Sequence, residues 1–373
     1  MKGKKILVTG GAGFVGSHTA DALLRRGHEV RIYDNLSKQV HSEGIPPYVS
    51  KDAEFIQGDV RDLPRLCDAV RGMDVIYHLA AAVGVGQSMY QIAHYTAVNN
   101  LGTANLLQAI LECGAQPEKL IVASSMSIYG EGKYHCAECG EVAPPPRPIL
   151  QLMEKRWDTR CPNCARNLVP VATPEDKPSQ CTSVYALSKK DQEEMMLLFG
   201  RTYGIPVIAF RYFNICGTRQ SLSNPYTGVS AIFASRLMNG EAPLIFEDGM
   251  QMRDFVSVHD IVQANLLALE KSAADGRALN VGSGEPIAIH EIAAELGRAL
   301  EVNLPAHMTG KYRAGDVRHC FGDISAISKL LGYCPQVRLK QGIQELVSWL
   351  RSQEADDHVE EAMERLNLHG LVA

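Results

Sequence analysis

The sequence contains no run of about 18 apolar residues, the minimum for a membrane-spanning helix, so we expect no membrane span. It also lacks an excess of positive charge, since its formal net charge is -5, which argues against nucleic-acid binding. No cleavable signal is recognisable, because residues 1–5 lead directly into an apolar segment. The ten cysteines do not form the framework of a secreted disulfide-rich protein. These absences predict a cytoplasmic protein.

The remaining composition is that of a globular protein. The chain has 373 residues, of which 46% are hydrophobic and 21% charged, so it can bury a substantial core. This length suggests two domains, or one large domain with an appendage.

The N-terminal region has the order of a dinucleotide-binding unit. An apolar segment at residues 5–9 precedes the glycine-rich turn 10–16, and a helical pattern follows at 17–26. A second apolar segment, 29–33, ends at Asp34. The glycines permit a tight turn and close approach to a pyrophosphate, while the helix N-terminus offers amides to the phosphates. The strand–turn–helix context makes the glycine pattern specific.

Asp34 stands where an acidic residue accepts hydrogen bonds from the adenosine ribose of NAD. Arg31 and Lys38 lie nearby and keep the 2′-phosphorylated cofactor possible. A simpler interpretation is that Asp34 only opens a turn.

Strand-like and helical segments continue to alternate. We expect strands at residues 54–57, 75–81 and 120–124, with an amphipathic helix at 99–113. This alternation predicts a doubly wound parallel sheet with its ligand at the carboxyl ends of the strands.

Tyr185 and Lys189 are four residues apart, so they share one face of a predicted helix. A neighbouring lysine favours the phenolate, which would make Tyr185 a proton acceptor near neutral pH. The spacing alone is weak, and it gains specificity only from the glycine-rich turn upstream.

The motifs together resemble those of the extended short-chain dehydrogenases/reductases that act on nucleotide sugars. They run in the family order from residue 5 to about residue 350. The matching positions are Thr9, Gly10, Gly13 and Gly16; Gly58-Asp59-Val60; His78-Leu79-Ala80-Ala81; Asn99; Ser124-Ser125 with Tyr129-Gly130; Tyr185 with Lys189; Arg211-Tyr212-Phe213-Asn214; Arg253-Asp254-Phe255-Val256, Val258 and Asp260; Asn280-Val281-Gly282; and Arg313, Gly315 and Asp316.

The resemblance implies an α/β fold with a Rossmann-type doubly wound parallel sheet, a smaller α/β substrate-binding lobe and a homodimer. The dimer would form through helices at residues 99–113 and 179–203. The expected division is an NAD-binding domain at 1–214 and 253–281, a substrate-binding lobe at 215–252 and 282–351, and a tail at 352–373. In the tail, Val359, Met363 and Leu366 recur at helical spacing and indicate a packed or frayed helix.

The resemblance also assigns roles to individual residues. Tyr185 would take the substrate hydroxyl proton, Ser125 would bond to the same oxygen, and Lys189 would hold the nicotinamide ribose and lower the tyrosine pKa. The implied cofactor contacts are Gly10, Gly13, Phe14, Val15, Gly16, Asp34, Asn35, Asp59, Val60, Leu79, Ala80, Ala81, Asn99, Ser124, Tyr185, Lys189 and Tyr212. The implied substrate contacts are Val85, Ser125, Met126, Tyr185, Asn214, Arg253, Arg313 and Asp316.

Met126 and Ser127 bear on the type of reaction. Sugar dehydratases and decarboxylases of the family carry acids at these positions, before the tyrosine equivalent to Tyr129. Neither residue here can protonate a leaving hydroxyl, which favours a 4-epimerase with tightly bound NAD that is regenerated in each turnover. A nucleotide-sugar dehydratase or reductase remains an alternative.

The stretches 82–90 and 224–229 most resemble those of dTDP-L-rhamnose 4-epimerases, which form the 6-deoxy-L-talose epimer. UDP-glucose, UDP-galactose, UDP-N-acetylhexosamine or UDP-uronate 4-epimerases are the alternatives.

An insertion at residues 133–172 contains two Cys-x-x-Cys pairs, Cys136 with Cys139 and Cys161 with Cys164. Their spacing predicts a zinc ribbon, whose four thiolates would hold a structural Zn²⁺. Free cysteines or redox pairs are the alternative. The insertion's position between Ser125 and the catalytic helix suggests a lid over the sugar pocket. This lid hypothesis would fail if replacing all four cysteines left KM and turnover unchanged in a folded protein.

A non-catalytic NAD-binding zinc protein is the remaining hypothesis of a different class. The joint presence of Ser125, Tyr185 and Lys189 counts against it. The absence of a basic cluster between Cys136 and Cys164 counts against nucleic acid as its partner.

Overall fold

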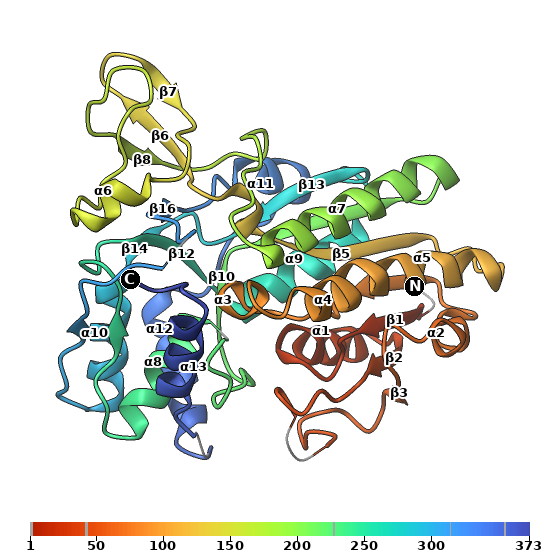
Figure 1. Ribbon diagram of the computed structural model, residues 1–373. Helices are drawn as coiled ribbons and strands as arrows, with labels where there is room; N and C mark the ends of the chain where they lie inside the picture. The colour runs from red at the N-terminus through yellow and green to blue at the C-terminus, as the bar shows by residue number, and fades with distance from the viewer. Residues whose placement is uncertain (1–2, 42–43, 227, 314, 354–355) are drawn as a thin grey trace.

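The protein is built around a seven-stranded parallel sheet (Figure 1). The computed structural model describes residues 3–41, 44–226, 228–313, 315–353 and 356–373. The strand order is β13-β9-β5-β4-β1-β2-β3, with successive neighbours parallel. The strands are β1 (Lys5–Thr9), β2 (Glu29–Asp34), β3 (Glu54–Gln57), β4 (Val75–His78), β5 (Lys119–Ser125), β9 (Val207–Tyr212) and β13 (Arg277–Val281). The doubly wound parallel sheet predicted from the sequence is confirmed.

Helices cover both faces of this sheet because its strands are apolar on both sides. Along β1, Ile6 and Val8 belong to one buried cluster and Leu7 to the other. The first cluster is covered by α1 (Phe14–Arg25), α9 (Val258–Glu270) and α11 (Ser325–Leu331). The second is covered by α2 (Leu63–Val70), α5 (Gly102–Glu112) and α7 (Val184–Tyr203).

The strand order reverses between β1 and β4, where a doubly wound sheet opens a crevice for its ligand. The strand predicted at 75–81 ends earlier, at His78, and residues 79–82 follow it without regular secondary structure at this end of the sheet. The helix predicted at 99–113 is also different, since a π-helical turn at Thr96–Leu101 precedes α5. That turn directs Asn99 onto the backbone N–H and carbonyl of Ala82. The π-helical turn therefore places Asn99 where its side chain fixes the backbone that follows β4.

A second group of elements lies beside the parallel sheet. It contains β10 (Asn214–Cys216), β12 (Met252–Ser257), β14 (Pro286–Ala288) and β16 (His319–Cys320), with the pair β11 (Leu244–Ile245) and β15 (His307–Met308). Its helices are α8 (Val229–Met238), α10 (Ile289–Leu300) and α12 (Leu339–Leu350). These elements enclose a separate apolar core around Phe233, Leu296 and Leu346.

The insertion forms a small antiparallel sheet that projects from the body (upper left in Figure 1). It contains β6 (Lys133–Cys136), β7 (Gly140–Val142), β8 (Val169–Val171) and the short helix α6 (Ile149–Met153). Its apolar cluster is small, and Cys136 and Cys161 are two of its four buried members.

The C-terminal tail is helical, as its spacing suggested, over α13 (Val359–Leu368). Leu366 is buried, and the last residue, Ala373, exchanges two backbone hydrogen bonds of 2.9 and 3.1 Å with Tyr312. The tail thus returns to the main body. Among the described residues, no helix combines the length and apolar character needed to cross a membrane.

Candidate active site

The glycine-rich turn at the end of β1 forms a cradle that larger side chains would fill. Gly10 has φ +68°, and a side-chain carbon there would lie 2.8 Å from the backbone nitrogen of Ala80. A side-chain carbon at Gly16 would collide with the carbonyl oxygen of Gly10. The cradle faces the N-terminus of α1, which begins at Phe14 and not at residue 17 as expected. This geometry fits the pyrophosphate of a dinucleotide.

Asp34 lies at the carboxyl end of β2, beside this cradle. Its carboxylate accepts hydrogen bonds from the backbone N–H groups of Ala12 (3.0 Å) and Leu36 (2.9 Å). It therefore ties the glycine turn to the turn after β2, and its contact with the adenosine ribose remains a prediction. Asp59 lies farther along the same edge, where hydrogen bonds from Arg61 and Asn35 hold its carboxyl pKa well below the usual range.

Ser125 and Tyr185 meet at the carboxyl edge of the sheet. Ser125 is the last residue of β5, and Tyr185 lies in the first turn of α7, whose N-terminus is capped by Ser183. The hydroxyl of Ser125 lies close enough to the phenol of Tyr185 to lower the pKa of that phenol. Ser127 donates a 2.8 Å hydrogen bond to the hydroxyl of Ser125, so a second serine orients the first. Lys189 follows one helical turn after Tyr185 and is 3% exposed.

The pKa of Tyr185 differs from the sequence expectation. Burial raises the pKa of its phenol, and the neighbouring Ser125 hydroxyl only partly offsets that rise. Lys189 does not supply a strong compensating charge, because burial lowers its own pKa to about 7. The expected lowered tyrosine pKa is therefore not produced by the protein's own side chains, because desolvation outweighs the influence of the neighbouring lysine.

A buried polar network behind Lys189 was not predicted. The Lys189 ammonium donates a 2.8 Å hydrogen bond to Oε1 of Gln192, whose amide donates to Thr103 at 2.8 Å. His78 joins Thr103 to Thr9 through contacts of 2.9 Å on its two ring nitrogens. Burial lowers the pKa of His78 to about 3, so its ring is neutral. The one available sequence signal was Gln192, three residues after Lys189 on the same helix face.

The other residues proposed for the cofactor lie around this network. The Asn99 side chain accepts a hydrogen bond from the backbone N–H of Ala82 and donates one to the hydroxyl of Ser188. The hydroxyl of Ser124 donates a 2.6 Å hydrogen bond to the carboxylate of Glu193. Tyr212 is adjacent to Ser125 across the sheet, and its hydroxyl donates to Asn265 at 2.7 Å. Val60 packs in the α2–α5 layer of the sheet. Phe14 and Val15 begin α1 directly after the glycine turn, and Leu79, Ala80 and Ala81 directly follow β4.

The proposed substrate residues come from separate elements. Oδ1 of Asn214, at the start of β10, is buried and has no hydrogen-bond partner among the described residues. Arg313 bonds to Asp316 at 2.8 Å, and its guanidinium lies 4.7 Å from the centre of the Phe246 ring. Arg253 donates to the carbonyl groups of Val317 and Arg318. Both arginines therefore contact the segment 316–318.

Two further proposed substrate residues lie in short helical segments. Val85 begins α3 (Val85–Ser88) and is 39% exposed, whereas Met126 begins the 3₁₀ turn Met126–Tyr129 and is partly buried. Ser88 of α3 accepts a 3.0 Å hydrogen bond from the backbone N–H of Tyr185, which fixes the start of the catalytic helix.

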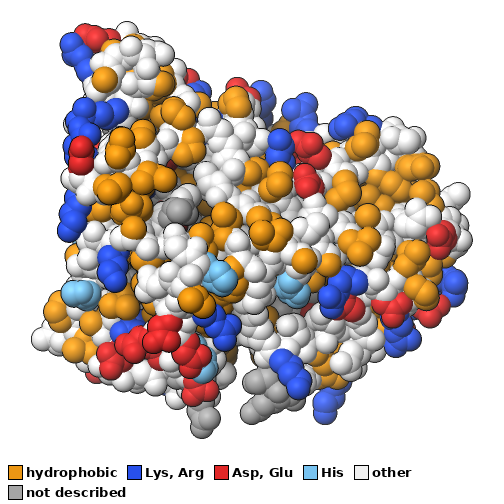
Figure 2. All heavy atoms as spheres, viewed as in Figure 1, with side chains coloured by type: hydrophobic (Ala, Val, Ile, Leu, Met, Phe, Trp, Pro, Cys, Tyr) orange, Lys and Arg blue, Asp and Glu red, His pale blue; other side chains and the backbone are white. Residues whose placement is uncertain are grey.

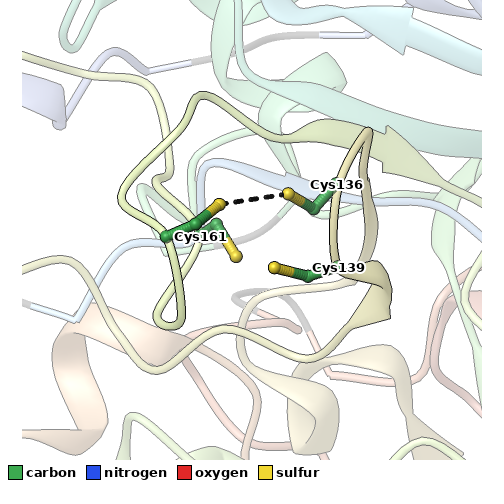
Figure 3. Close-up of side chains that lie close together, drawn as sticks. Cys136, Cys139 and Cys161 are labelled. Carbon is green, nitrogen blue, oxygen red and sulfur yellow. Dashed lines mark hydrogen bonds between the residues drawn. The ribbon is translucent and has the colours of Figure 1, made fainter.

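The four insertion cysteines converge (Figure 3). Their sulfur atoms all lie within 4.8 Å of one another, and those of Cys136 and Cys164 are 3.5 Å apart. A tetrahedral zinc–thiolate site with bonds of about 2.3 Å has sulfur–sulfur edges of about 3.8 Å, so the cluster fits this ion. Hydrogen bonds from backbone N–H groups of Cys139 and Glu138 lower the pKa of the Cys136 thiol to about 7.

The fold and the Ser125–Tyr185–Lys189 arrangement beside a dinucleotide cradle define a class of NAD-dependent enzyme. The chain belongs to the NAD dependent epimerase/dehydratase family, whose sequence model matches residues 6–148 and 167–282. The family resemblance drawn from the motifs is confirmed. Residues 149–166, which include Cys161 and Cys164, lie between the two matched segments.

Individual relatives extend over nearly the whole chain. A dTDP-L-rhamnose 4-epimerase from Burkholderia thailandensis is 34% identical, with 95% of this chain and 97% of the relative covered. A putative UDP-glucose 4-epimerase from Methanocaldococcus jannaschii is 31% identical, with coverage of 93% and 98%. The solved UDP-glucose 4-epimerase from Thermus thermophilus, in complex with NAD, has a TM-score of 0.74 and 30% identity, with coverage of 94% and 100%. These relatives and neighbours are nucleotide-sugar 4-epimerases.

Proposed function

We propose that the protein is a nucleotide-sugar 4-epimerase with tightly bound NAD. The observation that carries this proposal is the Ser125–Tyr185 pair beside the cradle, followed by Met126 and Ser127. No carboxylic acid stands at these two positions, so the site lacks the acid that would expel water from the sugar. Ser127 instead donates to Ser125 and supports the proton-transfer pair. Oxidation and re-reduction at one carbon need no further acid.

Each catalytic side chain has a distinct task in this reaction. The glycine cradle and Lys189 would hold NAD, whose nicotinamide would supply reversible hydride transfer at C4 of the sugar. Tyr185 takes the proton of the C4 hydroxyl and gives it back, while Ser125 holds the same oxygen. Lys189, positioned by Gln192, would orient the nicotinamide ribose.

The substrate we propose is dTDP-L-rhamnose, converted to dTDP-6-deoxy-L-talose. Support comes from the stretches 82–90 and 224–229 and from the 34% identity to the Burkholderia relative. Asn214, Arg253 and Arg313, with Asp316 ordering the last, would bind the diphosphate, because guanidinium groups pair with phosphate oxygens in two-point contacts. UDP-glucose, UDP-galactose, UDP-N-acetylhexosamine and UDP-uronates are the alternative substrates.

This function is tested by incubating the purified protein, without added cofactor, with dTDP-L-rhamnose and with each UDP-sugar. We expect an isomer of unchanged mass from dTDP-L-rhamnose. If only a UDP-sugar gives an isomer, the proposed reaction is supported and the proposed substrate is wrong. Loss of one water would instead identify a dehydratase, and no product after addition of NAD would contradict the proposal.

We also propose that Cys136, Cys139, Cys161 and Cys164 bind one structural Zn²⁺. The insertion has four buried apolar-cluster residues, two of them cysteines, so metal binding would supply folding free energy that its core lacks. Metal analysis should find one zinc per chain, and none in a Cys161→Ser/Cys164→Ser variant. Absence of zinc from freshly purified wild-type protein would favour free or redox-active thiols.

A homodimer through α5 and α7 is the assembly we propose. Apolar side chains gather on this side of the molecule (right in Figure 2) and include Leu101 (50% exposed) and Leu198 (57%). They border a shallow hollow of about 1150 Å³ between α7 and residues 92–104, a segment that includes the π-helical turn and the start of α5. Light scattering should give twice the chain mass, and Leu198→Glu should shift the protein to monomer. A monomeric wild type at micromolar concentration would contradict this assembly.

A further inference from the structure

Arg147 connects the insertion to the substrate side of the molecule. It is 8% exposed and lies just before α6. Its guanidinium makes a two-point contact with the carboxylate of Glu247, at 2.7 and 3.0 Å, beyond the end of β11. The same guanidinium donates to the backbone carbonyl groups of Trp157 (2.9 Å) and Asp316 (3.1 Å). One side chain therefore joins the insertion, Glu247 and the loop that carries Arg313.

A second set of contacts follows the same path. Arg318 donates to Glu247 and Asp248, and also to Asp158 of the insertion at 3.1 Å. Glu131, at the entrance of the insertion, accepts the backbone N–H groups of Arg318 (2.8 Å) and His319 (3.3 Å). These contacts hold Arg318 and His319, where β16 begins two residues after Val317. Buried charges of this kind are weak evidence for stability, but they restrict geometry because each partner must be satisfied.

The loop held in this way has little regular structure of its own. Gly315 has φ +80°, and a side-chain carbon there would lie 2.8 Å from the carbonyl oxygen of Thr182, just before the catalytic helix. Tyr312 lies against Trp157 of the insertion, with ring centres 6.4 Å apart. Since Arg313 and Asp316 are bonded to each other within this loop, a shift of the loop would move both.

We propose that the insertion braces the diphosphate-binding loop and that Arg147 is its main positioning residue. The role rests on the proposed function, because it assigns the nucleotide-sugar diphosphate to Arg313. Arg147 does not touch the substrate. It fixes the carbonyl of Asp316, and thereby the distance between Arg313 and the sugar site. Its effect should appear in substrate affinity and leave the chemical step and the cofactor cradle unchanged.

Arg147→Lys tests this role while keeping the charge beside Glu247. Lysine cannot make the two-point contact and also reach both carbonyl groups, because it has a single ammonium group. We expect KM for dTDP-L-rhamnose and Kd for dTDP to rise about tenfold, with kcat within about twofold and the NAD content unchanged. Hydrogen exchange should become faster at residues 311–313 and 315–318 and stay unchanged at the glycine turn.

Arg156→Lys is the matched control, because Arg156 also belongs to the insertion but its side chain is 50% exposed and, within the described part of the chain, forms an ion pair with Glu154 alone. It should behave as the wild type. If Arg147→Lys does not fold, Trp157→Leu removes a neighbouring contact of the same brace and should raise KM less strongly. If the wild type is active and all variants have the same KM, the positioning role of Arg147 is wrong and the proposed function still stands. A wild type that neither binds dTDP nor epimerises any of the nucleotide sugars would instead overturn the proposed function.

Discussion

At the scale of single residues, the least predictable part of the site is the surroundings of Lys189. The Tyr185–Lys189 pair could be predicted from the sequence, because residues four apart lie on the same face of a helix. No local pattern predicts the contacts around Lys189, because the partners are far apart in the sequence. Gln192 bonds to Thr103, 89 positions away, and His78 contacts Thr9, 69 positions away. Burial then reverses the expected sign of the Tyr185 pKa shift, and burial depends on the packing of the whole fold.

Gln192→Leu should weaken catalysis by releasing Lys189. The lost hydrogen bond stabilises the ammonium form, so the pKa of Lys189 should fall further and the alkaline limit of activity should move to lower pH. We expect kcat to decrease about tenfold. Gln192→Glu should have the opposite effect on the pH profile, since a carboxylate raises the lysine pKa. Steady-state kinetics between pH 6 and 10 measures both shifts.

Gln108→Leu provides the control, because this exposed glutamine of α5 makes its one side-chain hydrogen bond among the described residues to Glu112. Its pH profile should match that of the wild type. Identical profiles for the two Gln192 variants would mean that Gln192 does not govern the charge of Lys189.

At the scale of elements, short apolar runs were sufficient to predict the parallel strands β1 to β5, whereas β9 and β13 were not predicted. The π-helical turn around Asn99 was not predictable, because the side chain's bonds to Ala82 and Ser188 form only in the assembled fold. The contacts of the tail with the main body could likewise not be predicted from the sequence. Spacing predicted α13, but not that His369 would stack on Tyr90, with ring centres 4.8 Å apart, beside the proposed substrate segment α3.

Leu366→Ala should detach the tail helix. Leu366 is 5% exposed and lies next to Gly86 of α3, and truncation of a buried leucine costs about 2–5 kcal/mol. We expect faster tryptic cleavage at Arg365 and an increase of about threefold or more in KM for the nucleotide sugar. Leu368→Ala, two residues along the same helix, removes a side chain that is 83% exposed and should change neither. Equal protease sensitivity of the two variants would show that the tail does not depend on this contact.

At the scale of the whole molecule, buried histidines make the folded state sensitive to acid. Burial lowers the pKa of His78 and of His319 to about 3, whereas the unfolded chain titrates near 6.5. Above pH 6.5 both states are neutral and no stability is lost. As pH falls from 6.5 toward 3, the unfolded chain binds two protons that the folded protein excludes, so stability decreases.

The free energy of unfolding should fall by about 2–3 kcal/mol between pH 7 and pH 5.5 from these two groups. Urea unfolding at fixed ionic strength measures the change. His319→Asn retains an acceptor for the backbone N–H of Met252 and should remove about half of this pH dependence. His307→Asn, at an exposed position, should leave it unaltered. A His319→Asn variant with the full wild-type dependence would contradict this assignment.

The most direct test of the proposed reaction is the fate of the hydrogen at C4. The enzyme, without added cofactor, is incubated with dTDP-L-rhamnose carrying deuterium at C4, and the product is examined by mass spectrometry and NMR. Transient oxidation by a bound nicotinamide predicts an epimer of unchanged mass that retains deuterium at C4. Loss of the C4 deuterium to solvent, or a product lighter by one water, would contradict epimerisation by hydride transfer and return.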